Sequence, residues 1–425
     1  MTGTLAASGS TPRVPVLTVL PADPEQMEIG GIASFVRGFV KFAPDDFELS
    51  FVGVSSTREA WTWHRLQLEG REIALLPVVR ASARRSRIPI SLRFTAAMLT
   101  HPRARRRLVP ADRYVAGFHR PATDLGLGAG PRWRVVHLSV ADLTTSGSES
   151  RWRKGALLLR ALERRSFRRM DRIYVVNQRV AERYRREFPE IGERIEFIPN
   201  WADPTIFKPV PAADRHRQRV AVRQELGLPR DAPIVLFAGR LEGQKDPLLL
   251  AKTFARLRSA NASACLVVAG DGALMDAVCS ELAASGALDV VRFVGIVSRE
   301  RLAELMNASD ALAITSAFET GPTVGLEALA CGLPVVTTPV GEVAGLVAAT
   351  GAGRATGDRD PTTVARALGG VLGEGDGLRA AAVAAATPFL ADRVLRPFYE
   401  ENRRLAARLA ATSLSSAARS PRAPG

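Results

Sequence analysis

Two glutamates eight positions apart, Glu319 and Glu327, are spaced so that both carboxylates can contact one bound ligand. The apolar run 311–318 before Glu319 is typical of a strand buried on both faces. A Thr-Gly-Pro turn then leads into a helix that carries Glu327, and Pro322 suits its first turn because its missing amide hydrogen has no partner there. We therefore expect a carboxylate where ligands bind in open α/β sheets, at the carboxyl end of a strand.

The helix that carries Glu327 adds two further expectations. Its first amides, near Thr323 and Val324, are suited to hold an anion. The neighbours of Glu327 are apolar, so its carboxylate needs a partner to offset the loss of water. A purely structural interpretation remains open, with Glu319 as a partner of the helix dipole and Glu327 as a solvated helix residue.

A basic pair, Arg240 and Lys245, follows another apolar run, 234–238. Basic residues near the start of a helix oppose its dipole, which favours a phosphate-bearing ligand over a structural role. Two fixed cations together with helix amides can offset the charge of such a ligand without a metal. The chain has three scattered cysteines, which we interpret as buried thiols, so we expect neither a metal nor a cofactor.

The elements that must position these residues alternate between apolar runs and amphipathic segments, which is typical of an α/β protein. A chain of 425 residues predicts two domains, each with its own core. We predict a first α/β domain at residues 14–209 and a second at residues 210–385, followed by a terminal helix at residues 386–409. Residues 1–13 and 410–425 are predicted to be disordered tails.

Two features of the first domain are candidates for ligand contact. Gly30 and Gly31 lie between a strand and a helix, where a glycine pair either admits a ligand close to the backbone or simply makes a tight turn. His119 ends the predicted strand 114–119, where a ligand could reach it. His137 lies inside the predicted strand 134–140 and is interpreted as a packed core residue.

The segment from Glu319 to Glu327, continued by Ala-Leu-Ala-Cys-Gly-Leu-Pro-Val-Val, resembles the signature of the retaining, nucleotide-sugar-dependent glycosyltransferases of family 4. The resemblance is strong over residues 195–345 and weak before them. It implies an α/β protein of the GT-B fold, with two Rossmann-like domains facing each other across a cleft and the terminal helix crossing back to the first domain. Many members carry Glu-Gly-Phe at the turn, whereas this chain has Glu-Thr-Gly, which leaves the identity of the donor sugar open.

The same resemblance implies roles for individual residues. Glu327 would hold the ribose hydroxyls, Arg240 and Lys245 the diphosphate, and Glu319 the hexose hydroxyls. Glu319 and His119 would be the catalytic pair beside the sugar. The remaining donor-binding positions would be Ile296, whose backbone reads the base, Gly321, Thr323 and Val324 in the turn, and Gly30 and Gly31 near the phosphate or acceptor.

The implied function is a hexosyltransferase that moves a hexose-type sugar from a nucleotide diphosphate sugar to a hydroxyl acceptor with retention of configuration. The acceptor would be a glycan, a glycolipid or a polyprenyl-linked saccharide. The alternative is a catalytically inactive GT-B protein that binds a nucleotide sugar or a lipid. A nicotinamide dehydrogenase is disfavoured, because no Gly-x-Gly-x-x-Gly motif follows the first strand, 14–20.

Charge adds an expectation about partners. The net charge is +15, and residues 1–210 hold 34 Lys and Arg against 21 Asp and Glu. The arginine-rich segment 81–107 has two interpretations, a surface for anionic lipid headgroups or a solvated face. Nucleic-acid binding is disfavoured because stacking aromatics and known motifs are lacking. Without an apolar run of spanning length or a signal peptide, we expect a cytoplasmic protein, peripheral on the inner face of the membrane.

Overall fold

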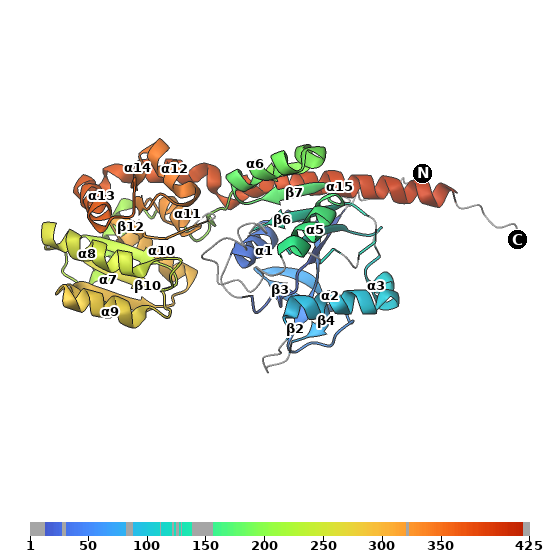
Figure 1. The fold of residues 1–425 in the computed structure, drawn as a ribbon, viewed down its shortest axis with the longest axis horizontal. Coiled ribbons are helices and arrows are strands. Elements are labelled where there is room, and N and C mark those ends of the chain that lie inside the picture. Colours follow the sequence, from blue (N-terminus) through green and yellow to red (C-terminus); the bar gives the residue numbers. More distant parts are fainter. Residues whose placement is uncertain are drawn as a thin grey trace, which may run out of the picture. The chain divides into compact units, whose positions relative to one another are not determined.

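The computed structural model describes residues 13–27, 31–81, 88–110, 112–120, 123–124, 127–128, 130–137, 156–319 and 323–419. The chain divides into two compact units (Figure 1). Unit 1 is Met1–Ile198 together with Leu395–Gly425, and unit 2 is Pro199–Val394. The division at 198 lies before the predicted boundary at 209, because the segment after Ile198 packs in unit 2. Ala202 accepts from the amide of Ala391 at 3.0 Å, and Phe207 lies in the core of unit 2.

Unit 1 is built on one eight-stranded sheet in the order β3-β4-β2-β1-β5-β6-β7-β8. Every pairing is parallel except that of β3 with β4. The first strand lies inside the sheet, where Val16 is level with Leu49 on one side and with Val115 on the other. The strands are β1 Val14–Val19, β2 Phe47–Ser55, β3 His64–Leu68, β4 Arg71–Arg80, β5 Val115–Phe118, β6 Arg132–Val136, β7 Arg172–Val175 and β8 Ile195–Phe197.

The helices of unit 1 begin and end where the sequence favours it. Asn177 caps α6 by accepting from the amide of Val180 at 3.0 Å, and Pro102 occupies the first turn of α3. The helices are α1 Gly31–Lys41, α2 Ile90–Thr100, α3 Pro102–Leu108, α5 Ala156–Phe167, α6 Gln178–Glu187, the 3₁₀ helix η2 Pro189–Arg194 and α15 Ala391–Arg419.

The terminal helix α15 supplies aromatic side chains to the core of unit 1. The Phe398 ring lies 4.9 Å from that of Trp133 and 4.8 Å from that of Tyr174. Trp133 Nε1 donates to Asn402 Oδ1 at 2.8 Å. The helix continues to Arg419, past residue 410, where the prediction places the start of a disordered tail. The predicted N-terminal tail lies outside the described residues except for Arg13.

Unit 2 is built on a fully parallel six-stranded sheet in the order β11-β10-β9-β12-β13-β14. Alternate residues of β9 pack on opposite faces: Ile234 and Leu236 lie in one hydrophobic cluster, and Val235 and Phe237 lie in another. The strands are β9 Ile234–Ala238, β10 Cys265–Ala269, β11 Val291–Gly295, β12 Ala311–Ile314, β13 Val335–Thr337 and β14 Gly353–Ala355.

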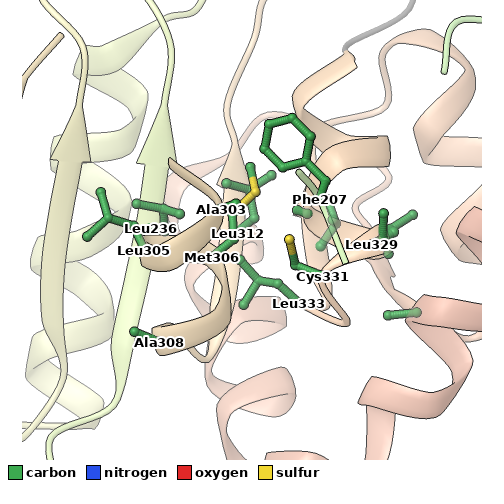
Figure 2. Close-up of a cluster of buried hydrophobic side chains, with 14 of the residues drawn as sticks. Phe207, Leu236, Ala303, Leu305, Met306, Ala308, Leu312, Leu329, Cys331 and Leu333 are labelled. Atoms are coloured by element: carbon green, nitrogen blue, oxygen red, sulfur yellow. The ribbon is translucent and has the colours of Figure 1, made fainter. Parts of the chain in front are cut away.

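Helices cover both faces of this sheet, and Figure 2 shows part of one core, with Met306, Leu312 and Leu333 side by side. Asp246 caps α8 and Asp360 caps α13, and each is followed by a proline at the first helical position. The elements are α7 Ala212–Glu225, α8 Pro247–Ala260, α9 Met275–Ala284, η3 Leu288–Val290, α10 Arg299–Ala308, α11 Thr323–Ala330, α12 Gly341–Thr350, α13 Pro361–Glu374, η4 Gly375–Leu378, α14 Arg379–Ala386 and η5 Thr387–Phe389.

Cys265 and Cys331 are buried free thiols and Cys279 is partly exposed. Within the described ranges, no helix is both long enough and apolar enough to cross a membrane.

Candidate functional site

The loops after β9 and β12 meet at the carboxyl edge of the sheet in unit 2. β9 and β12 are neighbours in this sheet, and the chain proceeds from β9 towards β11 on one side and from β12 towards β14 on the other. The amide of Ala317 donates to the carbonyl of Gln244 at 2.8 Å, and the Thr315 hydroxyl donates to the carbonyl of Lys245 at 3.0 Å. This is the topological switch point, the position where open α/β sheets bind ligands.

Lys245 and Glu319 form an ion pair between these two loops. Lys245 Nζ lies 2.5 Å from Glu319 Oε1, and the Ser316 hydroxyl donates to the same oxygen at 2.8 Å. The side chains are 20% and 7% exposed, so the pair is largely withdrawn from water. A cation and a carboxylate are thus held together at the switch point, where an anionic ligand would compete with Glu319 for Lys245.

The Thr315 contacts also explain why β12 is shorter than predicted. The strand ends at Ile314, four residues before the predicted end at Phe318. The Thr315 hydroxyl contacts the carbonyls of Lys245 and Asp246, and the Thr338 hydroxyl donates to the carbonyl of Ser316 at 2.9 Å. Side-chain hydrogen bonds therefore hold this backbone as a loop and turn Glu319 towards Lys245.

Arg240 belongs to the same loop as Lys245 but has different partners. Its side chain is 63% exposed, and its guanidinium lies 2.5 Å from Glu242 Oε2. It also donates to Gln244 Oε1 at 3.4 Å. Arg240 therefore lies at the exposed rim of the loop, and its partners are Glu242 and Gln244 instead of Glu319.

Glu327 lies on α11 between the buried residues Leu326 and Ala328. Loss of water around its carboxyl group raises its pKa to about 7, which the positive charge of Arg299 opposes and the negative charge of Asp203 reinforces. Arg299 in turn lies 3.5 Å from Asp203 Oδ2. Thr323 and Val324, in the first turn of α11, are partly exposed, as anion contact requires.

Glycines bring the ends of three strands close together on the other side of β9. The amide of Gly239 donates to Ala269 O at 2.9 Å, and that of Gly270 donates to Gly295 O at 2.7 Å. A Cβ atom on Gly270 would lie 1.9 Å from Gly239 O, so only glycine fits. Ile296 follows directly, with 75% of its surface exposed at this edge.

Unit 1 pairs two histidines at the ends of adjacent strands. His119 follows β5 and His137 follows β6, with His119 Nδ1 3.2 Å from His137 Nε2 and the Phe35 ring centroid 5.5 Å from each. Burial lowers the pKa of His137 to about 3 and that of His119 well below its usual range. The pair is therefore neutral at physiological pH.

The structure corrects the sequence-based view of these histidines. β6 ends at Val136, so His137 lies after the strand and not inside it. His119 is only 4% exposed, whereas His137 is partly exposed. The reason is that the rings of Phe35 and Trp133 pack against His119, leaving its Nε2 buried without a hydrogen-bond partner.

Some predicted positions cannot be placed in a site. Gly30 and Gly321 lie outside the described residues, and Gly31 is the first residue of α1. Other residues at the switch point escaped the sequence reasoning, namely Ser316, Gln244 and Phe318. Phe318 is 51% exposed beside Glu319, although it ends an apolar run that predicts burial. Gln244 contacts the distant loop through Phe318, for which the sequence has no local signal, whereas the Ser316 hydroxyl contacts Glu319 within its own loop.

Comparison with known proteins finds a family match over most of unit 2. Residues 218–387 match the family described as glycosyl transferases group 1. The matched segment contains β9 to β14 and therefore Arg240, Lys245, Glu319 and Glu327.

Curated proteins and solved structures are also similar to this chain. A D-inositol 3-phosphate glycosyltransferase from Xylanimonas cellulosilytica is 35% identical over 198 residues, which are 46% of this chain and 46% of that protein. The aligned part of the chain spans about half the length of this curated relative. Among solved structures, sucrose-phosphate synthase from Thermosynechococcus elongatus superposes with a TM-score of 0.72 at 19% identity, covering 93% of this chain and 100% of the other.

HepE from Anabaena, solved in complex with UDP, superposes with a TM-score of 0.63 at 16% identity, covering 93% of this chain and 99% of the other. The similarity to these solved structures extends over both units, and each unit contains a mainly parallel, Rossmann-like sheet. The predicted GT-B fold with two Rossmann-like domains is thereby confirmed.

Proposed function

We propose that this protein is a retaining hexosyltransferase, which moves a hexose-type sugar from a nucleotide diphosphate sugar to a hydroxyl acceptor. The observation that carries the proposal is the Lys245–Glu319 ion pair at the switch point of the glycosyl transferases group 1 domain. A cation next to a carboxylate suits a ligand that has a phosphate next to sugar hydroxyls. The phosphate would bind Lys245, and the hydroxyls would donate to Glu319.

In the proposed donor complex, Lys245 leaves Glu319 for the diphosphate and Arg240 reaches the same group from the rim. The amides of the first turn of α11, near Thr323 and Val324, add their partial positive charge. Glu319 then accepts hydrogen bonds from the hexose hydroxyls and Glu327 from the ribose. Ile296 lies beside the base, while Gly321, Gly30, Gly31 and His119 keep the roles that the sequence resemblance implies.

The reaction needs little proton chemistry from the protein. The bond between the anomeric carbon and the phosphate oxygen breaks while the acceptor oxygen attacks from the face that the phosphate leaves. The departing phosphate oxygen takes the acceptor proton. The protein contributes positioning and stabilisation of the diphosphate charge. Since Lys245, Arg240 and helix amides supply that positive charge, we propose that no metal or cofactor is required.

The relatives suggest where to begin with substrates. One relative is a D-inositol 3-phosphate glycosyltransferase, and one solved neighbour holds UDP. We therefore propose uridine diphosphate sugars as the first donors to test. For the acceptor we propose a glycan, glycolipid or polyprenyl-linked saccharide presented at the inner face of the membrane, with the protein in the cytoplasm.

The decisive experiment combines ligand-induced thermal shifts with product analysis. Wild type, Lys245→Met and the control Arg256→Ala, which removes an exposed arginine of α8, are melted with nucleoside diphosphates and nucleotide sugars. A ligand at one hundred times its Kd should stabilise the wild type by about 2.7 kcal/mol. Lys245→Met should weaken binding about ten- to hundredfold, as expected for one lost charge-assisted hydrogen bond, and the control should match wild type.

Transfer is measured by mass spectrometry of the product, and the anomeric configuration by NMR, with and without EDTA. Product of retained configuration, formed equally well with EDTA, supports the proposal. Nucleotide binding without sugar transfer or donor hydrolysis would instead favour the inactive binding protein. Folded wild type that no nucleotide stabilises would show that the switch point is not a donor site.

A further inference from the structure

The α2 and α3 helices of unit 1 expose apolar and basic side chains together. Of the five large apolar side chains exposed within the described residues, three lie between positions 88 and 99, and these are Ile88 at 57%, Leu92 at 51% and Leu99 at 49%. The α3 helix directly after them exposes three arginines. We refer to this set as the α2–α3 surface, made of Ile88, Leu92, Leu99, Arg103, Arg106 and Arg107.

Helix α2 is apolar on two opposite sides. Phe94 and Met98 are 0% and 1% exposed and fix one side to the core of unit 1. Leu92 and Leu99 are seven positions apart, so they lie on a common face, two turns from each other. An exposed apolar stripe on a helix that is already anchored by its other side marks a surface for interaction.

The sequence segment that forms this stripe carries charge of one sign. Between Glu72 and Asp112 the sequence contains nine arginines and no acidic residue. Arg105 Nη1 donates to the carbonyl of Met98 at 2.5 Å, which fixes the start of α3 against the end of α2. The same helix exposes Arg103, Arg106 and Arg107, which form the basic part of this surface.

An aromatic side chain completes the surface at the junction of the two helices. The ring of Trp61 stacks on that of His101 with centroids 5.0 Å apart, and His101 joins α2 to α3. Trp61 is partly exposed and has a φ of 63°, which is unfavourable for a bulky residue. Tryptophan is enriched where proteins meet the boundary of a lipid bilayer.

We propose that the α2–α3 surface docks on an anionic lipid bilayer. Leu92 and Leu99 enter the boundary between headgroups and acyl chains, Arg103, Arg106 and Arg107 contact the anionic headgroups, and Trp61 lies at their level. A bilayer is the partner that presents negative charge directly above an apolar layer, which matches arginines that border leucines. A nucleic acid would use the arginines but leave the leucines in water. The proposal is independent of sugar transfer.

The test is sedimentation of the full-length protein with vesicles of phosphatidylcholine alone and of phosphatidylcholine with phosphatidylglycerol. We expect binding to the anionic vesicles that weakens with salt. Arg106→Ala combined with Arg107→Ala should weaken it about 30-fold, from roughly one basic contact each. Leu92→Ser combined with Leu99→Ser leaves the net charge unchanged. Each of the two substitutions should weaken binding to anionic vesicles by at least about tenfold.

The matched control is Arg179→Ala combined with Arg186→Ala, which removes two exposed arginines from α6 of the same unit. This variant should bind vesicles like wild type, and circular dichroism should show every variant folded. Equal loss of binding in this control would reduce the effect to net charge and overturn the proposal. Wild type that does not sediment with anionic vesicles, or leucine variants that bind as tightly as wild type, would overturn it as well.

Discussion

Glu319 and Glu327 show how one residue type acquires two properties from its surroundings. Glu319 accepts from Lys245 and Ser316, which compensate its charge. Glu327 is flanked by buried apolar residues, and its pKa rises to about 7. The first carboxylate is therefore already paired, whereas the second gains from any ligand hydroxyl that donates to it.

The raised pKa of Glu327 predicts a pH dependence of stability. Its carboxyl group loses its proton near 4.5 in the unfolded chain but near 7 in the folded one. Between these values the folded state holds the extra proton, so the free energy of unfolding falls as the pH rises from about 4.5 to about 7. Glu327→Gln removes this loss, on the order of 3 kcal/mol.

The measurement is the Tm of ligand-free wild type and Glu327→Gln at pH values from 5 to 8. The difference between variant and wild type should grow up to about pH 7 and then stay constant. Glu300→Gln, at an exposed position of α10, is the control and should show no such growth. A constant difference across the whole range would mean that the Glu327 carboxyl is ionised throughout.

Among the elements, the close approach of strand ends in unit 2 depends on glycine. Gly270 has a φ of 144°, and its amide donates to Gly295 while its Cα faces the carbonyl of Gly239. The contact brings the loops after β9 and β10 together next to Arg240. A larger residue would push these loops apart.

Gly270→Ala should therefore lower the free energy of unfolding by about 3 kcal/mol or more, from steric overlap and an unfavourable φ combined. Gly370→Ala, at an exposed position of α13 with nothing within 4 Å of its Cβ, should instead raise it by about 0.5–1 kcal/mol. Differential scanning calorimetry of both variants checks this. A melting curve of Gly270→Ala that coincides with wild type would contradict the geometry of this contact.

At the scale of the whole molecule, unit 1 is completed by residues from both ends of the chain. Phe398 packs on Phe35, Phe39 and Trp133, and the Tyr399 hydroxyl donates to the carbonyl of Phe39 at 2.8 Å. Arg403 pairs with Asp46 at 2.7 Å. Unit 1 thus needs residues that follow the whole of unit 2 in the sequence.

Phe398→Ala should destabilise unit 1 by about 3–5 kcal/mol because it leaves a cavity among aromatic rings. Hydrogen exchange followed by mass spectrometry should show faster exchange in β6, β7 and α1 but unchanged exchange in residues 199–394. Phe254→Ala, in the core of unit 2, should give the reverse pattern. Uniformly faster exchange in either variant would mean that the two units unfold together.

Much of the fold and of unit 2's site follows from the sequence, and the exceptions have local causes. Apolar runs predicted most strands, and the Glu319–Glu327 spacing predicted a carboxylate at a strand end. The end of β12 was misplaced because hydroxyls of Thr315 and Thr338 bind backbone of other segments. Strand β6 ends at Val136, before His137, and the sequence neighbours of His137 do not indicate its contact with His119.

The sequence by itself determined which segments are strands and helices, because the period of apolar residues and the capping residues are local properties. It also placed Arg240, Lys245 and Glu319 each at a strand end. Only the tertiary structure decided that β9 lies beside β12, which brings Lys245 to Glu319 across 74 residues. It also decided that Leu92 and Leu99 of unit 1 are exposed to solvent. The order of strands in a parallel sheet depends on how crossover helices pack, which is a property of the whole domain and not of any one segment.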